Sequence, residues 1–531
     1  MRNKVRHSIL IALLAGAVTH RAPAQIAATA QIAATAQIAA TAQVAATAQI
    51  AATAQVAGPA PDSARAMRTT PATDILNAAR PPATDSQSHD VLPAVEIAGF
   101  LVFLNVAGRI MYANQTQDGI KVYSSTLSST WNHIHTQRWV YDIDPFNTNQ
   151  FQHPYQGASM YGFARSSGHG YYASLVYANV GSFVWKMAGE TDPPSINDLI
   201  TTGQAGSLLG EALYRMADLV LKAGSADKPN RWQKYGASAL SGGLNRGILG
   251  TNFRTGLSDT VPVTFWHIGF GATLDALTRD LTTPTSLLMR RDATVDFSMS
   301  YGLPGQRGHD YTRPLDYFDF QASFLPSTFS NFIENIMIRG LIVGEKTEDT
   351  DNSRGIWGLY GSFDYIAPYL FRVSSTALSL GTTRQYAIAP HVALQGSLLG
   401  GIGYGAAGST TVIASTPINA AIRDYHFGIT PQALAALRLI LGDRAMFDLT
   451  AREYYVSGTG SDDTQGSERI FRGSFGVTFR VHGGNGLGMQ YVFSARDGKY
   501  GKQPEKQVQE GTITIVYTIL GGEHFGAVRW R

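Results

Sequence analysis

The chain has 531 residues, a formal net charge of +3 and no cysteine. The absence of cysteine excludes disulfides, thiolate metal sites, a cysteine nucleophile and a lipid-modified cysteine anchor. The small net charge gives no support for nucleic-acid binding. Charged residues make up only 15% of the chain, against about 25% in typical soluble domains.

The first 24 residues predict a secretory signal peptide. Basic residues between Arg2 and Arg6 are followed by the apolar run Ile9–Val18 and by Ala22-Pro23-Ala24, a small-residue cleavage site. An apolar run this short is typical of a signal peptide and cannot span a bilayer as a permanent anchor. We therefore expect an exported protein.

Residues 25–90 predict a disordered tether. The hexapeptide Gln-Ile/Val-Ala-Ala-Thr-Ala repeats from Gln25 through Ala54, and a Pro- and Ser-containing segment follows. This period is far below the 20 to 50 residues of solenoid units. Alanine methyl groups also offer little area to bury, so we expect a low-complexity linker.

A compact helical module is expected over residues 91–250. Its first element, Val95–Ala113, is an apolar stretch interrupted by Asn105 and Arg109. Because this stretch barely reaches the length of a membrane span, its pattern favours a buried or interfacial helix over a transmembrane one. A shorter helix is expected to begin after His153-Pro154.

The best-defined helix of the module is predicted over Ser195–Lys222. Ser195 can cap the helix start, and Asp198 completes the pattern of a capping box. Small or short side chains recur four residues apart on one face, at Asp198, Thr202, Gly206 and Gly210. Each glycine lowers helix stability by about 1 kcal/mol, so the stripe implies close contact with another backbone. The expected partner is the apolar segment Tyr171–Met187.

Polar residues near these helices form the candidate site. The candidate catalytic residues are His153, Glu190 and Asp198, and the surrounding polar network comprises Arg165, Asp192, Asn197, Glu211 and Arg215. Imidazole and carboxylate groups can act as general acids and bases or bind a cation. The same residues can equally form a hydrogen-bond network at helix termini, because buried charges need partners. No phosphate loop or dinucleotide fingerprint is present, and we expect neither a cofactor nor a resident metal.

Three motifs in this region carry a family resemblance. They are N-Q-F-x-H-P-Y-x-G at 149–157, W-x-x-x-G-E-x-x-P-P-S-x-N-D-L at 185–199 and G-E-x-L-x-R at 210–215. Over about residues 95–250 the chain resembles an uncharacterised family, domain of unknown function 3943, found in cell-surface proteins of Gram-negative bacteria. The resemblance implies an outer-membrane setting and supplies no activity. Lys186 stands where the resemblance implies an acidic residue.

Residues 251–531 predict a transmembrane β-barrel. The spacing changes to period two, as in Val295, Phe297, Met299 and Tyr301, and strands of about ten residues suit a tilted membrane strand. Twelve strands are expected near residues 261, 293, 315, 333, 356, 371, 387, 426, 444, 469, 486 and 509. An open sheet edge is not tolerated in lipid, so the sheet must close. The fold class is therefore α+β, with an antiparallel barrel of about 12 strands after the helical module.

The barrel pattern also assigns side chains to its two surfaces. The charged residues expected in the lumen are Asp296, Asp319, Asp448, Arg452 and Arg480. Because both signs occur, strong ion selectivity is not expected. Tyr365 and Tyr455 are expected in the aromatic girdle at the membrane interface. The segment Gly521–Arg531 extends past the last strand, which departs from the usual end of such barrels.

These features predict an outer-membrane barrel with a structural role or a role in small-solute passage. The helical module is expected to plug the lumen, with a periplasmic position beneath the barrel as the alternative. The expected partners are outer-membrane lipid and the barrel-insertion machinery, and no nucleic acid. The alternative function is an outer-membrane hydrolase that acts on lipid or envelope material through His153 and Glu190. A third interpretation keeps the sheet soluble, as a periplasmic β-sandwich.

Overall fold

The computed structural model describes most of the chain from residue 90 to residue 528. Gaps in the description fall at 115, 118–119, 137, 142–143, 224–228, 242–261, 281–290, 327–331, 348, 369–371, 409–424, 459–465, 501–504 and 523. The predicted signal peptide and nearly all of the predicted tether lie outside the described residues.

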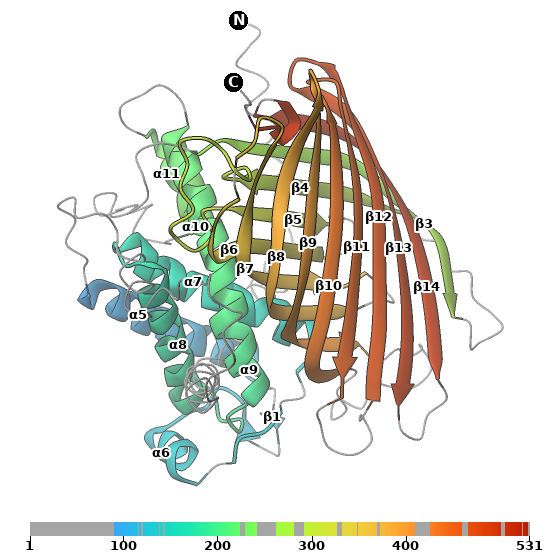
Figure 1. Ribbon diagram of the computed structural model, residues 1–531. Coiled ribbons are helices and arrows are strands. Elements are labelled where there is room, and N and C mark those ends of the chain that lie inside the picture. The colour runs from blue at the N-terminus through green and yellow to red at the C-terminus, as the bar shows by residue number, and fades with distance from the viewer. Residues whose placement is uncertain are drawn as a thin grey trace, which may run out of the picture.

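The helical module precedes the barrel, as predicted (Figure 1). Its helices are α5 (Val91–Met111), α6 (Leu127–His135), α7 (His153–Ser166), α8 (Tyr171–Ala188), α9 (Ile196–Ile200), α10 (Gly206–Lys222) and α11 (Arg231–Leu240). A short hairpin, β1 (Thr116–Gln117) and β2 (Ile120–Lys121), joins α5 to α6. Thr126 and Asn230 begin α6 and α11 with capping boxes that satisfy free backbone N–H groups.

The helix predicted over Ser195–Lys222 is present, but it is not uniform. A π-helical turn, Thr201–Ala205, lies between α9 and α10. The predicted capping box is wrong, because the Ser195 side chain accepts no hydrogen bond from a backbone N–H of the helix start and its hydroxyl donates to the Asp198 carboxylate. The free N–H of Ile196 instead donates to the carbonyl of Val140 at 2.8 Å, which ties the helix start to a preceding segment.

The small-residue stripe contacts α7, so the predicted pairing with the Tyr171–Met187 segment is wrong. A Cβ built on Gly157 of α7 would lie 2.2 Å from the carbonyl oxygen of Thr202, and one on Gly206 would lie 2.8 Å from the Gly157 Cα. Gly210 faces the ring of Tyr161 in the same way. The physical reason is that α7 carries a glycine at the crossing point, which permits backbone-to-backbone contact.

Twelve strands form a closed antiparallel barrel, which confirms the predicted number. They are β3 (Thr264–Asp280), β4 (Arg291–Tyr301), β5 (Phe318–Phe324), β6 (Ile333–Lys346), β7 (Ser353–Ile366), β8 (Val373–Ala389), β9 (Val392–Gly408), β10 (Tyr425–Leu441), β11 (Ala445–Ser457), β12 (Gly466–His482), β13 (Asn485–Tyr500) and β14 (Lys506–Gly521). Each strand pairs with its neighbours in sequence, and β14 pairs with β3 to close the ring.

The two ends of the barrel differ in their connections. At one end, called here the turn end, β8 and β9 are joined by two residues, and β12 and β13 by Gly483-Gly484. Gly483 takes a positive φ of 56°, as a tight hairpin requires. At the other end, called the loop end, every connection is longer than these two, while the connection from β4 to β5 (302–317) is a long exception at the turn end. Since β3 begins and β14 finishes at the turn end, the chain enters and leaves the barrel on that side.

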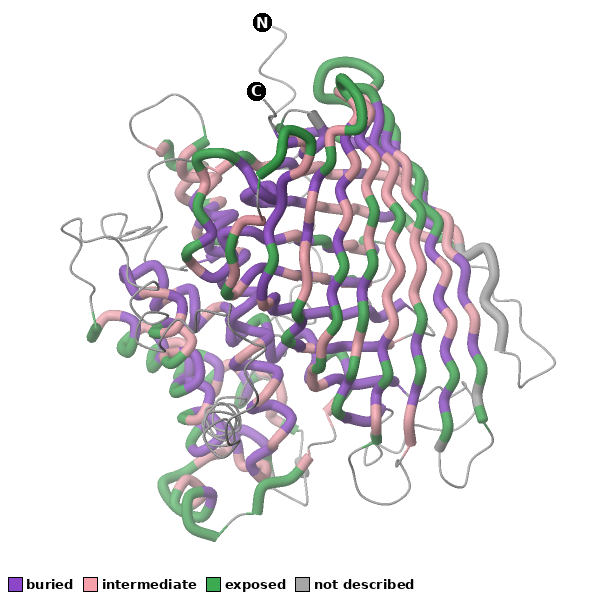
Figure 2. Tube along the Cα trace, in the orientation of Figure 1, coloured by how far each residue is buried: buried purple, intermediate pink, exposed green. Residues whose placement is uncertain are grey.

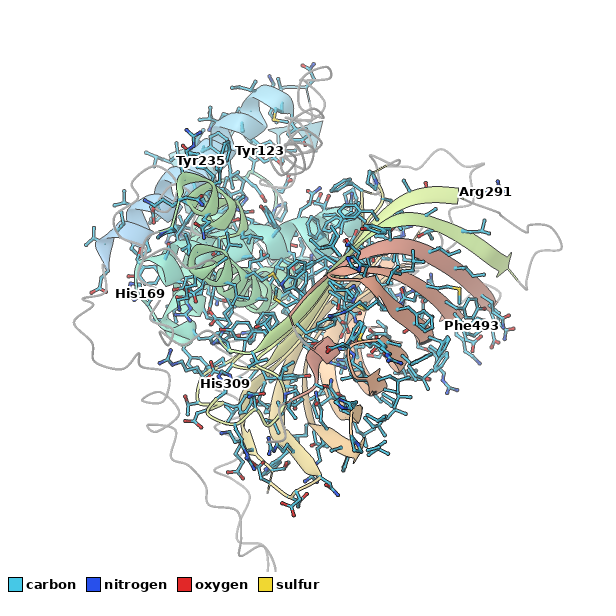
Figure 3. The ribbon with its side chains drawn as sticks, turned by 90° about the horizontal axis from the view of Figure 1, so that it is seen from above. Tyr123, His169, Tyr235, Arg291, His309 and Phe493 are labelled. Atoms are coloured by element: carbon cyan, nitrogen blue, oxygen red, sulfur yellow. The ribbon has the colours of Figure 1, made fainter. Side chains whose placement is uncertain are left out.

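The helical module lies against the outside of the barrel, so the predicted position in the lumen is wrong. Leu208 of α10 packs on Gly361 of β7, whose neighbours Ser362 and Asp364 face the interior. Figure 3, the view from above, shows the helices beside the ring of strands, with Tyr235 and His169 on the side away from Arg291 and Phe493. The alternative prediction, a position beneath the barrel, is also wrong, because the module packs on the outer wall of the strands.

The reason for this position is an apolar patch on the outer wall of β4–β7. Its outward residues are large and almost fully covered: Met299, Tyr301, Phe318, Phe320, Ile336, Ile338, Phe363 and Tyr365. They share one hydrophobic core with α7 and α10. Tyr365 was expected in the aromatic girdle but is only 2% exposed, because Phe146 and Phe151 stack near it. Figure 2 shows buried residues where the helices meet the strands and exposed residues at the lower end of the module, around α6.

Candidate functional site

Part of the predicted polar network forms a chain of ion pairs, called here the His153 cluster. His153 Nε2 lies 3.0 Å from Asp198 Oδ1, at the point where α7 and α9 begin. Lys186 Nζ of α8 lies 3.2 Å from Asp198 Oδ2 and 2.6 Å from Glu190 Oε2. Asn197 donates to Asp198 at 2.8 Å. One ammonium group therefore bridges the two carboxylates that the sequence assigned to the candidate site.

The remaining predicted residues form a second group, called here the Glu211 cluster. Arg165 of α7 binds Glu211 of α10 in a bidentate pair, with N–O distances of 2.6 and 2.9 Å. Arg215 binds the same carboxylate at 2.9 Å, as the predicted i,i+4 spacing requires. Tyr161 donates a further hydrogen bond to it at 2.8 Å. The structure thus places seven of the eight predicted residues in two clusters, and the eighth, Asp192, is half-buried in the turn before α9.

Two members of these clusters were missed by the sequence analysis. Lys186 is spaced i,i+4 from Glu190 and could have been found from that spacing. Asp316 lies in the connection between β4 and β5 and accepts from Arg215 at 3.0 Å. No local pattern predicts that contact, because 101 residues separate the two partners.

The geometry of the His153 cluster is that of a structural ion-pair network. His153 and Asp198 have no exposed surface and Glu190 is 5% exposed, so a substrate in solution has no access to the carboxylate or the imidazole. Within the described ranges, no three His, Asp or Glu side chains converge on a site for a metal ion. Each charge has an oppositely charged partner, which offsets the cost of burying it. No observation favours the predicted hydrolase.

The lumen of the barrel contains a polar cavity of about 170 Å³. Four of the charged residues predicted to face the lumen line this cavity, namely Asp296, Asp319, Asp448 and Arg452. His267, Arg339, Arg438 and Arg472 line it as well, and the period-two pattern could have identified them. Many of these charges are paired across strands: Arg339 binds Asp319 at 2.6 Å, and Arg438 binds Asp448 at 2.6 Å.

The C-terminal segment closes the turn end of the lumen. Past β14 the chain folds back, and Phe525 is fully buried in a cluster with Phe265, Ile440 and Met446. The amide of Gln385 holds this segment at two points, donating to Gly526 O at 2.7 Å and accepting from Val528 N at 2.9 Å. The described part of the predicted extension, residues 524–528, is therefore a plug, and Arg480 lies over the Phe525 ring at 5.2 Å.

The connection from β4 to β5 (302–317) packs over the same rim. The Tyr311 hydroxyl donates to Gly302 O at 2.8 Å, and burial raises the pKa of this phenol, which keeps it a neutral donor. Leu315 N donates to Leu341 O at 2.7 Å, which extends the sheet into the connection. Since Asp316 of this connection binds Arg215, the rim of the barrel and the helical module are joined by an ion pair.

The opposite end of the lumen is narrowed by apolar side chains. A cluster of inward-facing residues lies near the loop end, composed of Ile366, Val373, Ala407, Tyr454, Val456 and Ile470. Within this cluster, the Tyr454 hydroxyl donates to the Asp364 carboxylate at 2.9 Å, and Arg452 binds the same carboxylate. The polar cavity thus lies between this apolar cluster and the C-terminal plug.

Comparison with known proteins supports no particular activity. The comparison with curated proteins finds no match. Among solved structures, the chain is similar to the NanC porin, with 6% sequence identity and a TM-score of 0.26, over 48% of this chain and 98% of that one. It is similar to the CymD monoaromatic hydrocarbon channel (9% identity, TM-score 0.20, 51% of this chain and 91% of that one). A further similar structure is the Pseudomonas putida toluene transporter TodX, with 9% sequence identity and a TM-score of 0.20, over 53% of this chain and 93% of that one.

These similarities are too low to support a functional conclusion, which must come from the geometry of this chain. The family comparison is more specific. Residues 138–242, which contain α7 to α11 and both ion-pair clusters apart from Asp316, match the model of Domain of unknown function (DUF3943). This confirms the resemblance found from the three motifs, and the matched segment lies within the helical module.

Proposed function

We propose that this protein is an outer-membrane β-barrel through which small polar solutes pass, and that the described conformation is its closed state. The observation that carries the proposal is the polar cavity of about 170 Å³ inside the barrel. A purely structural barrel is most stable when its interior is filled by packed side chains. Here the interior holds paired charges around an unfilled space, which is suited to a hydrated solute.

The C-terminal plug is held weakly enough to be displaced. Burial of a phenylalanine side chain such as Phe525 contributes about 1.5–3 kcal/mol. The two hydrogen bonds of Gln385 contribute about 1 kcal/mol each. Gly522 precedes the plug with a positive φ of 89° and can serve as its pivot. Differential binding of a solute to the open state can offset a total of this size.

Conductance through planar bilayers tests the proposal. The intact protein should show a low conductance, and a variant that lacks residues 524–531 should conduct more. Adding Ile470→Ser to the truncation should raise the conductance further, because it makes the loop-end constriction smaller and more polar. Since both signs of charge line the cavity, the reversal potential in a salt gradient should stay near zero.

A matched pair of substitutions separates gating from general damage to the barrel. Phe525→Ala removes the plug side chain, whereas Phe479→Ala removes an outward aromatic that is 49% exposed. Only the first should raise the conductance. If the truncated Ile470→Ser variant keeps the heat-modifiable gel mobility of a folded barrel and conducts no more than the intact protein, passage is ruled out and a structural role remains.

A further inference from the structure

The outer side of the helical module has an apolar surface that solute passage does not use. Every exposed residue of α8 is alanine or valine: Ala173, Val176, Val180, Val184 and Ala188. On α5 the exposed residues include Val95, Val102, Phe103, Val106 and Ile110. Helix α5 is also long and apolar enough to cross a membrane, with a mean hydropathy of 1.9 over its best window, of which only 28% is buried.

Charge is nearly absent from this surface. Arg109 is the one charged residue among the exposed positions of α5, where Glu96 is partly buried, and its guanidinium donates to Asn105 Oδ1 at 2.8 Å and to Ser125 O at 2.8 Å. Lys186, the one charged residue of α8, points inward to Glu190 and Asp198. A helix face in water normally carries charged residues opposite its apolar stripe, and these two helices do not.

The apolar surface lies at the height of the barrel strands. At the start of α7, Phe151 packs on Tyr365 near the loop end of β7, with ring centroids 5.6 Å apart. Leu208 of α10 meets the middle of the same strand at Gly361, and Arg215 reaches the turn end. Helix α8 packs along α7, so its outer face lies beside the wall and not above or below it.

The outer wall of β4–β7 is covered by the helices, whereas the outer wall of the other strands is exposed and apolar, as a surface in contact with lipid is. Outward residues of the other strands are exposed, as in Leu380 (66%), Leu398 (64%) and Ile515 (59%), whereas Phe318 and Phe363 under the helices are fully buried. A segment that covers a transmembrane barrel at this height takes the place of lipid there. Its own outer side must then meet the hydrocarbon, which tolerates only apolar side chains and satisfied backbone groups.

We infer that the helical module is embedded in the membrane beside the barrel, with the outer faces of α5 and α8 in contact with lipid acyl chains. The interior of the module has the features of helix packing in lipid. Helices meet through small residues at Gly157 and Gly206. The charged groups of the His153 and Glu211 clusters face the interior of the bundle and are paired, as intramembrane charges are.

Exposed aromatic residues mark the two ends of the module. Trp232 and Tyr235 of α11, next to the end of α10, are 55% and 54% exposed, and Arg231 lies over the Trp232 ring at 5.1 Å. At the other end, Trp131 of α6 is 63% exposed. Tryptophan and tyrosine are enriched at membrane–water interfaces because their rings are apolar and their N–H or O–H groups are polar.

The lack of cysteine makes a direct test possible. Val102→Cys on α5 and Val180→Cys on α8 place one thiol each on the inferred lipid face. Leu437→Cys on the exposed outer wall of β10 is the lipid-facing control, and Asp351→Cys in a turn-end connection is the water-facing control. Each variant is labelled with an environment-sensitive fluorophore and reconstituted into phosphatidylcholine vesicles. Quenching by acyl-chain doxyl lipid is then compared with quenching by iodide.

The ratio of doxyl to iodide quenching at positions 102 and 180 should match that at position 437 and exceed that at position 351 several-fold. Strong iodide quenching at 102 and 180 would place the module in water and overturn the inference. Protection from both quenchers would show that protein covers the face, a second copy included, and would overturn it as well. If the fluorophore at position 437 is also quenched by iodide and not by doxyl lipid, the barrel itself is not inserted in the bilayer. That result overturns the inference together with the proposed function.

A measurement on the unmodified chain guards against misfolded variants. A lipid-soluble photoactivated carbene reagent in the same vesicles should label peptides from α5 and α8 as strongly as peptides from β9 and β14. Labelling confined to the barrel peptides would contradict the inference without any substitution.

Discussion

The Glu211→Gln variant should lose about 3–5 kcal/mol of unfolding free energy, because breaking a buried ion pair leaves an uncompensated charge. Glu211 is fully buried and is the one carboxylate shared by Arg165 and Arg215 in the described structure. Glutamine keeps the volume of the side chain and removes its charge. Both guanidinium groups would then remain buried, and Asp316 would be the single carboxylate left for Arg215.

The loss should appear as a lower urea midpoint, with an unchanged slope, for the reconstituted protein followed by tryptophan fluorescence. The matched control is Glu453→Gln, which removes a carboxylate from the pair with Arg469 on the outer surface of β11 and β12, close to the loop end of both strands. Because Arg469 is 69% exposed, water replaces the lost partner and the midpoint should hardly move. Equal shifts in the two variants would show that the Glu211 cluster does not hold the module together.

The Gly157→Ala variant should lose about 1–3 kcal/mol, the usual cost of overpacking a tight contact. A methyl group at this position would lie 2.2 Å from the carbonyl oxygen of Thr202 and 2.8 Å from its side-chain methyl. The obstacle is backbone, so α7 must move away from the π-helical turn. That movement also pulls apart the contact with Gly206 and shifts His153 relative to Asp198.

Gly99→Ala is the matched control for this substitution, because a methyl group at Gly99 of α5 meets no atom within 4 Å. Alanine has a higher helix propensity than glycine. Gly99→Ala should therefore leave the free energy of unfolding unchanged or raise it, whereas Gly157→Ala should lower it. Loss of helical circular dichroism on heating is the measurement. A Gly157→Ala protein as stable as the Gly99→Ala protein would mean that the helix contact is looser than described.

The barrel could be predicted from sequence because its signal is local. Alternation such as Val295, Phe297, Met299 and Tyr301 depends only on which side of one strand a side chain occupies. The same alternation placed Asp319 and Arg452 in the lumen, and the structure confirms both positions. The helices were found for the same reason, through caps, glycines and i,i+4 spacing.

The arrangement of these elements could not be predicted, because it depends on which apolar surfaces meet. The outer wall of β4–β7 has the same alternation as the rest of the barrel, so nothing in the sequence distinguishes Phe363, under the helices, from an outward residue in lipid. Tyr365 was misplaced for that reason. The contacts of Arg215 with Asp316 and of Gln385 with Gly526 join residues 101 and 141 positions apart, which no periodic pattern reports.

The covered wall of β4–β7 constrains the order of assembly. In a bilayer, lipid chains solvate an apolar wall as well as helices do, so no hydrophobic force would draw the module in afterwards. The paired charges of α7 and α10 would also have to cross hydrocarbon on the way. The module must therefore dock on the nascent sheet before the ring is released into lipid, and a barrel inserted alone should not capture its helices when these are supplied later as a separate fragment.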